Sequence, residues 1–190
     1  PGTHARVAEH VAANAAANVV LTRAGLWHET TELTFGRDPG EEDNLGSFSA
    51  GGGTGGVTCP VVRFDEFAAA HGVGPVGLVK MDIEGAELFA LRGMAGTLAR
   101  DRPLLLMEVN RAACERLGYD PAALWALLAG DLGYRPWLIG RGPADWREVA
   151  DPAGLPQGNL LFCPGDRPAA TRDVHLKAAL RWAARRGGRG

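Results

Sequence analysis

Two acidic residues of this 190-residue sequence each follow a short apolar run that has the character of a buried strand. Asp82 follows residues 76–81, and Glu108 follows residues 104–107. Such continuous apolar strands are typical of a parallel sheet, whose ligands bind at the carboxyl ends of the strands. If the two strands are neighbours, both carboxylates face one crevice. There they could accept a proton from a bound hydroxyl group or orient it, as a general base does.

The same region also allows structural interpretations. Asp82, Glu84 and Glu87 stand at the start of a predicted helix, where carboxylates cap free N–H groups and complement the helix dipole. We favour a functional role for Asp82, because the strand end and the turn at Gly85 expose it. A capping role for Glu84 and a structural role for Glu87 remain alternatives.

Glu108 has two further explanations. It could be a buried acid that pairs with Lys80 or with an arginine. It could also bind a divalent cation together with Asp82, since carboxylate oxygens suit such ions. The sequence indicates no third ligand, and we therefore predict no metal.

The elements that must position these acids alternate between helix and strand. Helices are predicted at residues 4–17, 66–71, 84–99 and 121–132, and strands at 19–21 with 26–27, 31–35, 61–64, 76–81, 104–107, 134–139 and 159–163. This order predicts an α/β fold, a doubly wound sheet with helices on both faces. The last two strands lack a helix between them and are expected to pair antiparallel at one edge. Asp65 is placed to cap the helix at residues 66–71.

Residues 36–58 form a predicted loop that is long for a compact domain, and such loops are usually functional or disordered. Asn44 and Ser47 lie in it, followed by a glycine run at residues 51–56. That run follows no buried strand and opens no helix, as a phosphate-binding loop would. We therefore interpret it as a flexible insertion.

Composition excludes several classes of protein. The net charge of −2 gives no overall sign of nucleic-acid binding, and no apolar run reaches the roughly 20 residues that span a bilayer. The three cysteines form no CxxC pair, which argues against a zinc site or a disulfide framework and favours the cytoplasm. We divide the chain into a domain at residues 1–168 and a basic C-terminal helix and tail at 169–190. The tail is expected to be solvated, with an acidic partner or nucleic acid as the alternative.

Residues 79–87, which read Val-Lys-Met-Asp-Ile-Glu-Gly-Ala-Glu, resemble the central signature of the FkbM-family methyltransferases. The resemblance continues through Leu91-Arg92-Gly93 and residues 103–108. Residues 63–67 are similar to the step before the central strand, and residues 14–26 resemble the helix and third strand of the family. The likeness covers roughly residues 5–110.

This resemblance implies a Rossmann-like class I methyltransferase fold that uses S-adenosylmethionine. The acceptor would be an oxygen of a small molecule, a sugar or a lipid-like compound. Gly25 and Leu26 would lie beside the adenine, and Asp82 would lie next to both cofactor and acceptor, with Glu108 as its catalytic neighbour. Asn44 and Ser47 would belong to a cofactor-binding loop that could close over the site, with a plain solvated loop as the alternative.

The sequence departs from the family where the first two strands are expected. It has neither the glycine-rich turn after the first strand nor the second strand with its terminal acid, which would hold the ribose hydroxyls. We therefore expect a truncated domain, with an exposed edge at residues 76–81, that binds S-adenosylmethionine poorly and is inactive by itself. Two alternatives are another cofactor-binding α/β enzyme, such as a nicotinamide oxidoreductase, and a non-catalytic partner-binding module. The former needs a glycine fingerprint that is absent here.

Overall fold

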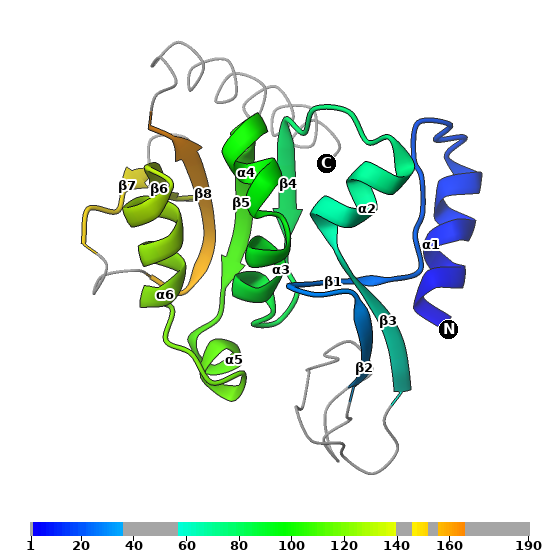
Figure 1. Cartoon of the computed structure of the whole chain (residues 1–190), viewed down its shortest axis with the longest axis horizontal. Coiled ribbons are helices and arrows are strands. Elements are labelled where there is room, and N and C mark those ends of the chain that lie inside the picture. Colours follow the sequence, from blue (N-terminus) through cyan, green and yellow to red (C-terminus); the bar gives the residue numbers. More distant parts are fainter. Residues whose placement is uncertain (1, 36–56, 140–145, 152–155, 166–190) are drawn as a thin grey trace, which may run out of the picture.

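The structure, a computed structural model, describes residues 2–35, 57–139, 146–151 and 156–165 (Figure 1). Helices and strands alternate along much of the chain, which confirms the α/β prediction. The elements are α1 (Gly2–Ala13), β1 (Gly25–Trp27), β2 (Thr31–Phe35), β3 (Val57–Arg63), α2 (Phe64–His71), β4 (Leu78–Met81), α3 (Glu87–Gly93), α4 (Ala95–Asp101), β5 (Leu104–Val109), α5 (Arg111–Arg116), α6 (Ala122–Trp125), the π-helical turn η1 (Ala126–Asp131), β6 (Tyr134–Leu138), β7 (Arg147–Glu148) and β8 (Gly158–Pro164).

The described strands form two sheets. The larger has the order β4-β5-β8-β6-β7, with β4 parallel to β5 and the other neighbours antiparallel. The smaller has the order β1-β3-β2, with β1 parallel and β2 antiparallel to β3. The predicted antiparallel pairing of the last two long strands is confirmed, and the short β7 lies outside them. Among the described strands β4 has a neighbour on one side only, and its Leu78 is 60% exposed.

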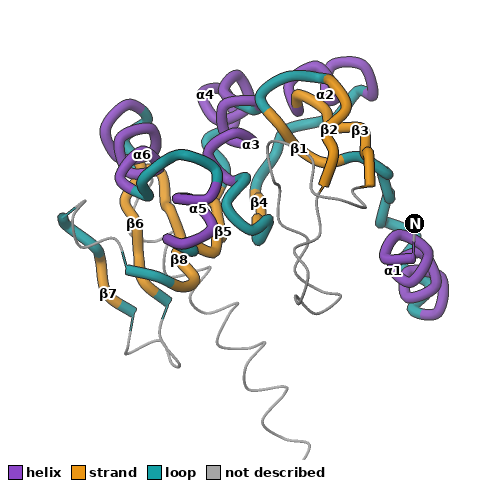
Figure 2. The backbone as a smooth tube through the Cα atoms, turned by 90° about the horizontal axis from the view of Figure 1, so that it is seen from below, coloured by secondary structure: helices purple, strands orange, loops and turns teal. Residues whose placement is uncertain are grey.

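The main core lies between the larger sheet and the helices α3, α4 and α6, which Figure 2 shows on one face of that sheet. In β5 the alternation of side chains directs Leu105 and Met107 into this core. Spacings of three and four residues bring leucines of the helices onto the same face. The buried core side chains include Met81, Leu88, Leu91, Met94, Leu98, Leu124, Leu128, Leu160 and Phe162. Burial of each of these side chains stabilises the folded state by about 2 kcal/mol. Together they hold the ends of β4 and β5 in place.

The prediction of a buried strand at residues 19–21 is wrong. These residues are irregular, and Val20 is 89% exposed. The helix before them is also shorter than predicted, since α1 ends at Ala13 and not at residue 17. Ala15 adopts a left-handed conformation with φ 47°, and the side chain of Asn14 binds the carbonyl oxygen of His10. Among the described residues no strand lies beside this apolar run, so its backbone has no strand with which to form hydrogen bonds.

The predicted helix at residues 84–99 is two helices. Glu84 and Gly85 both have positive φ, so that α3 begins only at Glu87, and Met94 separates α3 from α4. Similarly, residues 121–132 comprise α6 and η1, and β4 begins at Leu78 where residue 76 was predicted. These boundaries shift the ends of elements and leave their order unchanged.

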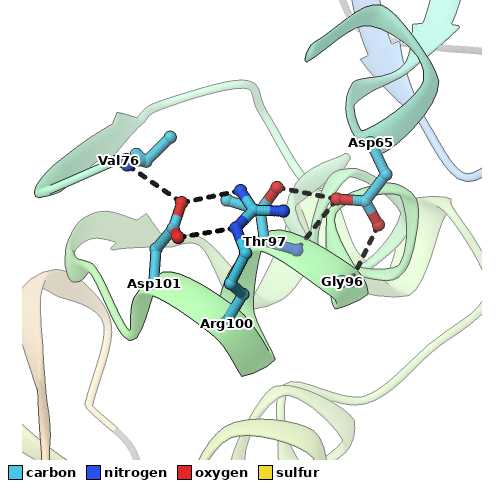
Figure 3. Close-up of polar contacts among 6 residues, drawn as sticks. All are labelled: Asp65, Val76, Gly96, Thr97, Arg100 and Asp101. Carbon is cyan, nitrogen blue, oxygen red and sulfur yellow. Dashed lines mark hydrogen bonds and ion pairs between the residues drawn. The ribbon is translucent and has the colours of Figure 1, made fainter. Parts of the chain in front are cut away.

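Asp65 caps a different helix from the one predicted. It lies in the first turn of α2, and its carboxylate accepts hydrogen bonds from the backbone N–H groups of Gly96 and Thr97, at 2.8 and 2.9 Å, and from Thr97 Oγ1 at 2.7 Å (Figure 3). The carboxylate therefore satisfies free N–H groups at the start of α4. At the other end of α4, Asp101 accepts a bond from the backbone N–H of Val76, which fixes the approach to β4.

Replacement of Asp65 by asparagine is expected to lower the free energy of unfolding by about 1–2 kcal/mol near neutral pH. Burial raises the pKa of Asp65, but the bonds from Thr97 and Gly96 and the charge of Arg63 outweigh it, so the pKa is lowered. A lowered pKa gives stability that is present above about pH 4 and is lost as pH falls through the folded-state pKa. Urea unfolding at several pH values should show the difference from wild type shrinking in acid, with Asp131→Asn as control. An unchanged difference would contradict this role.

Several predicted features lie outside the described residues. They are the loop residues Asn44 and Ser47, the glycine run at 51–56, and the boundary between residues 168 and 169 with the basic tail. Val57 and Thr58, which were predicted as loop, belong to β3. Within the described part of the chain, no helix has the length and apolar character needed to cross a bilayer.

Candidate active site

The parallel pairing of β4 with β5 brings Asp82 and Glu108 side by side. Met81 pairs with Met107, and Asp82 and Glu108 are the residues that follow them. Both methionines are buried in the core, and side chains alternate along a strand. The two acids therefore face the opposite side of the sheet, away from α3. Glu108 lies within β5, which continues to Val109, whereas the sequence predicted it just beyond the strand.

The carboxyl groups of Asp82 and Glu108 are hydrogen-bonded to each other, and Lys80 Nζ lies 3.1 Å from Asp82 Oδ2. The bond with Glu108, and then Lys80, lowers the pKa of Asp82. The same bond, with burial and the charge of Asp82, raises the pKa of Glu108. The pKa values of the two carboxyl groups are thus driven apart, and Asp82 is the more acidic of the pair. Pairs of acids with pKa values driven apart are typical of functional sites.

Glu84 is a third acid at this place. One carboxylate oxygen from each of Asp82, Glu84 and Glu108 lies within 4.8 Å of the other two. The capping role considered for Glu84 is not seen, since α3 has Ala86 at its N-cap position with no side-chain bond. The left-handed conformation of Glu84 is what turns it toward the pair, and sequence pattern gave no signal of that conformation.

Asn159 is a further neighbour that the sequence analysis missed. It pairs with Glu108 across β5 and β8 and is exposed. Directly paired residues of adjacent strands have their side chains on the same face of the sheet. Asn159 therefore adds an amide to the face that carries the acids. Asn159 lies beside Glu108 only because β8 is inserted between β5 and β6. No local sequence motif indicates that pairing.

Gly25 and Leu26 belong to β1 in the smaller sheet, and Leu26 packs against the main core. The helix α3, which follows the Asp82 turn, packs against this strand. Trp27 at the end of β1 stacks on Phe89 of α3, with ring centroids 4.1 Å apart. A Cβ atom on Gly93 would lie 2.0 Å from the carbonyl oxygen of Trp27, so glycine is required for this close approach. Thus α3 links the strand predicted beside the adenine to the turn that carries the acids.

Comparison with protein families matches residues 5–136 to the family described as the methyltransferase FkbM domain. Among solved structures, the chain is similar to the crystal structure of methyltransferase FkbM from Methylobacillus flagellatus KT, with 17% sequence identity and a TM-score of 0.47. That match covers 85% of this chain and 33% of the other, so the chain spans about a third of the length of the solved protein. A search of curated proteins found no match.

Proposed function

We propose, from the premise that this chain belongs to the FkbM methyltransferase domain family, that it takes part in methyl transfer from S-adenosylmethionine to an oxygen of a small-molecule, sugar or lipid-like acceptor. The comparison gives a family of methyltransferases, while methyl transfer by this protein, the donor, the oxygen acceptor and the roles of individual residues belong to the proposal. The observation that carries it is the Asp82–Glu108 pair at the carboxyl ends of β4 and β5, inside the matched residues.

Asp82 is proposed to hold the acceptor. Its lowered pKa keeps the carboxylate ionised at neutral pH, so that it accepts a hydrogen bond from an acceptor hydroxyl group. This bond would direct an oxygen lone pair toward the methyl group. Such alignment supplies a large part of the rate acceleration of a displacement reaction. The hydroxyl proton passes to the shared pair of Asp82 and Glu108 as the new carbon–oxygen bond forms.

The charge of the site fits S-adenosylmethionine at its reactive end. When bound, the cofactor supplies an electrophilic methyl group on a cationic sulfonium. Three acids face one lysine at this place, Asp82, Glu84 and Glu108 against Lys80, which gives a negative field suited to a cation. Gly25 and Leu26 would contact the adenine.

We propose further that these 190 residues bind S-adenosylmethionine weakly by themselves. Support comes from the separation of β1 and β4 into different sheets and from the one-sided pairing of β4 among the described strands. Titration calorimetry is expected to give a dissociation constant on the order of 1 mM or weaker, against micromolar values common for enzyme ligands. A micromolar constant for these 190 residues would contradict the proposal.

A cytoplasmic location is part of the same proposal. Cys59, Cys114 and Cys163 form no disulfide in the described residues. Reduced thiols of this kind are usual in the cytosol.

The function is tested by incubating the complete gene product with methyl-labelled S-adenosylmethionine and a panel of monosaccharides, aliphatic alcohols, amines and carbon acids. We expect label to enter a hydroxyl-bearing compound, with one S-adenosylhomocysteine formed for each methyl group transferred. Label found on nitrogen or carbon acceptors alone would overturn the oxygen assignment. Binding of a protein partner with no methyl transfer to any acceptor would favour a non-catalytic module.

A further inference from the structure

The turn between β4 and α3 has an uncommon backbone. Glu84 and Gly85 are consecutive residues with φ of 52° and 96°. Glycine adopts such angles readily, whereas glutamate does so at a cost and only where its surroundings hold it. This conformation brings the carboxylate of Glu84 to Asp82 and Glu108. The geometry of the acidic site therefore depends on the contacts that hold the turn in this conformation.

Glu87 lies beneath this turn and is only 2% exposed. Its Oε1 accepts a hydrogen bond of 3.0 Å from the backbone N–H of Ile83. Burial raises the pKa of Glu87, and the hydrogen bond from Ile83 opposes that rise. A buried acid is costly unless it is hydrogen-bonded, and here the backbone N–H of Ile83 in the turn provides such a bond.

Other contacts hold the turn from the side of α5. The hydroxyl of Tyr119 donates a 2.6 Å hydrogen bond to the carbonyl oxygen of Gly85. Burial raises the pKa of Tyr119, so the hydroxyl stays protonated and remains a donor. A Cβ atom on Gly85 would lie 2.5 Å from the carbonyl oxygen of Ala113, so the turn is pressed against this helix. Glu87 and Tyr119 thus bind N–H and carbonyl groups of one short segment.

We infer that Glu87 is a positioning residue for Asp82, holding the turn at residues 83–85 in the one conformation that assembles the acidic site. The inference rests on the proposed function for the role of Asp82, and it assigns Glu87 no contact with cofactor or acceptor. An apolar residue could fill the same volume in the core. It could not bind the N–H group of Ile83, and the turn would relax toward ordinary backbone angles.

The test compares Glu87→Leu, which keeps volume, with Glu87→Gln, which keeps an oxygen acceptor for Ile83. Amide hydrogen exchange in the 190-residue chain should show lost protection at Ile83 in Glu87→Leu and largely restored protection in Glu87→Gln. In the complete gene product, Glu87→Leu should lower kcat about 10- to 100-fold, as misplacement of a reacting group does. KM for S-adenosylmethionine should change less, and Glu87→Gln should recover most of the rate. Glu115→Gln, on the exposed side of α5, is the control.

Tyr119→Phe provides a second variant that keeps the buried ring if Glu87→Leu fails to fold. It should raise exchange at residues 83–85 and lower kcat a few-fold, without loss of the folded state. Unchanged protection at Ile83 in a folded Glu87→Leu protein would overturn the inference, as would a Glu87→Gln protein as impaired as Glu87→Leu. If exchange changes as expected while Asp82→Asn leaves methyl transfer intact, the proposed role of Asp82 fails and the positioning of the turn stands.

Discussion

The Asp82→Asn variant of the complete gene product is expected to transfer methyl groups about 10²- to 10⁴-fold more slowly than wild type, the range found when a proton-accepting group is lost. Asparagine keeps the size of the side chain and an oxygen that can accept the hydrogen bond of Lys80. It loses the negative charge that orients the acceptor hydroxyl and receives its proton. The Asp82 side chain is 49% exposed, so the fold depends little on it. The variant should therefore retain the wild-type free energy of unfolding.

Asp131→Asn is the matched control for this experiment, since Asp131 is also exposed and lies in η1 on another part of the domain. Its rate of methyl transfer should equal that of wild type. Initial rates of S-adenosylhomocysteine formation at saturating cofactor measure both variants. A folded Asp82→Asn protein with an unchanged rate would remove Asp82 from the chemistry.

Replacement of Gly93 by alanine is expected to destabilise the domain by about 3 kcal/mol. The new Cβ atom would lie 2.0 Å from the carbonyl oxygen of Trp27 and 3.3 Å from the Cα atom of His28. Both are backbone atoms, which cannot swing aside as a side chain can, and over-packing of this kind costs about 1–3 kcal/mol or more. Urea unfolding followed by circular dichroism measures the loss. Tryptophan fluorescence should report a disturbed stack between Trp27 and Phe89.

Gly130→Ala, in η1, is the matched control, because a Cβ atom there would meet no other atom. No atom lies within 4 Å of the Cβ position there, and alanine favours a helix over glycine by about 1 kcal/mol. This variant should be as stable as wild type or slightly more so. If Gly93→Ala behaved like Gly130→Ala, the close contact between α3 and β1 would be wrong.

The strands β4 and β5 and the acids that follow the buried methionines could be predicted from sequence because their signals are local. An apolar run followed by an acid and a glycine indicates a strand end wherever it occurs, and parallel neighbours align their carboxyl ends. The same kind of signal misled at residues 19–21. An apolar run becomes a strand only when a neighbour accepts its hydrogen bonds, and none of the described strands does so.

The features that sequence could not predict depend on contacts between distant residues. Asp65 caps α4, 31 residues away, because the first turn of α2 lies against it. Asn159 lies beside Glu108 because β8 is inserted between β5 and β6. Glu84 lies close to the two acids because its backbone is left-handed, in a turn that Glu87 holds through a hydrogen bond to Ile83. These arrangements follow from tertiary packing, which leaves no periodic pattern in the sequence.

The central claim is that the turn after β4 and the adjacent end of β5 form the reactive side of a cofactor site. Titration of the isotopically labelled 190-residue chain with S-adenosylhomocysteine, followed by nuclear magnetic resonance, tests it without knowledge of the acceptor. We expect the largest backbone shift changes at Asp82, Gly85 and Glu108, with a second group at Gly25 and Leu26, in fast exchange at ligand concentrations on the order of 1 mM. Shift changes confined to other parts of the domain, or none at saturating ligand, would contradict the claim.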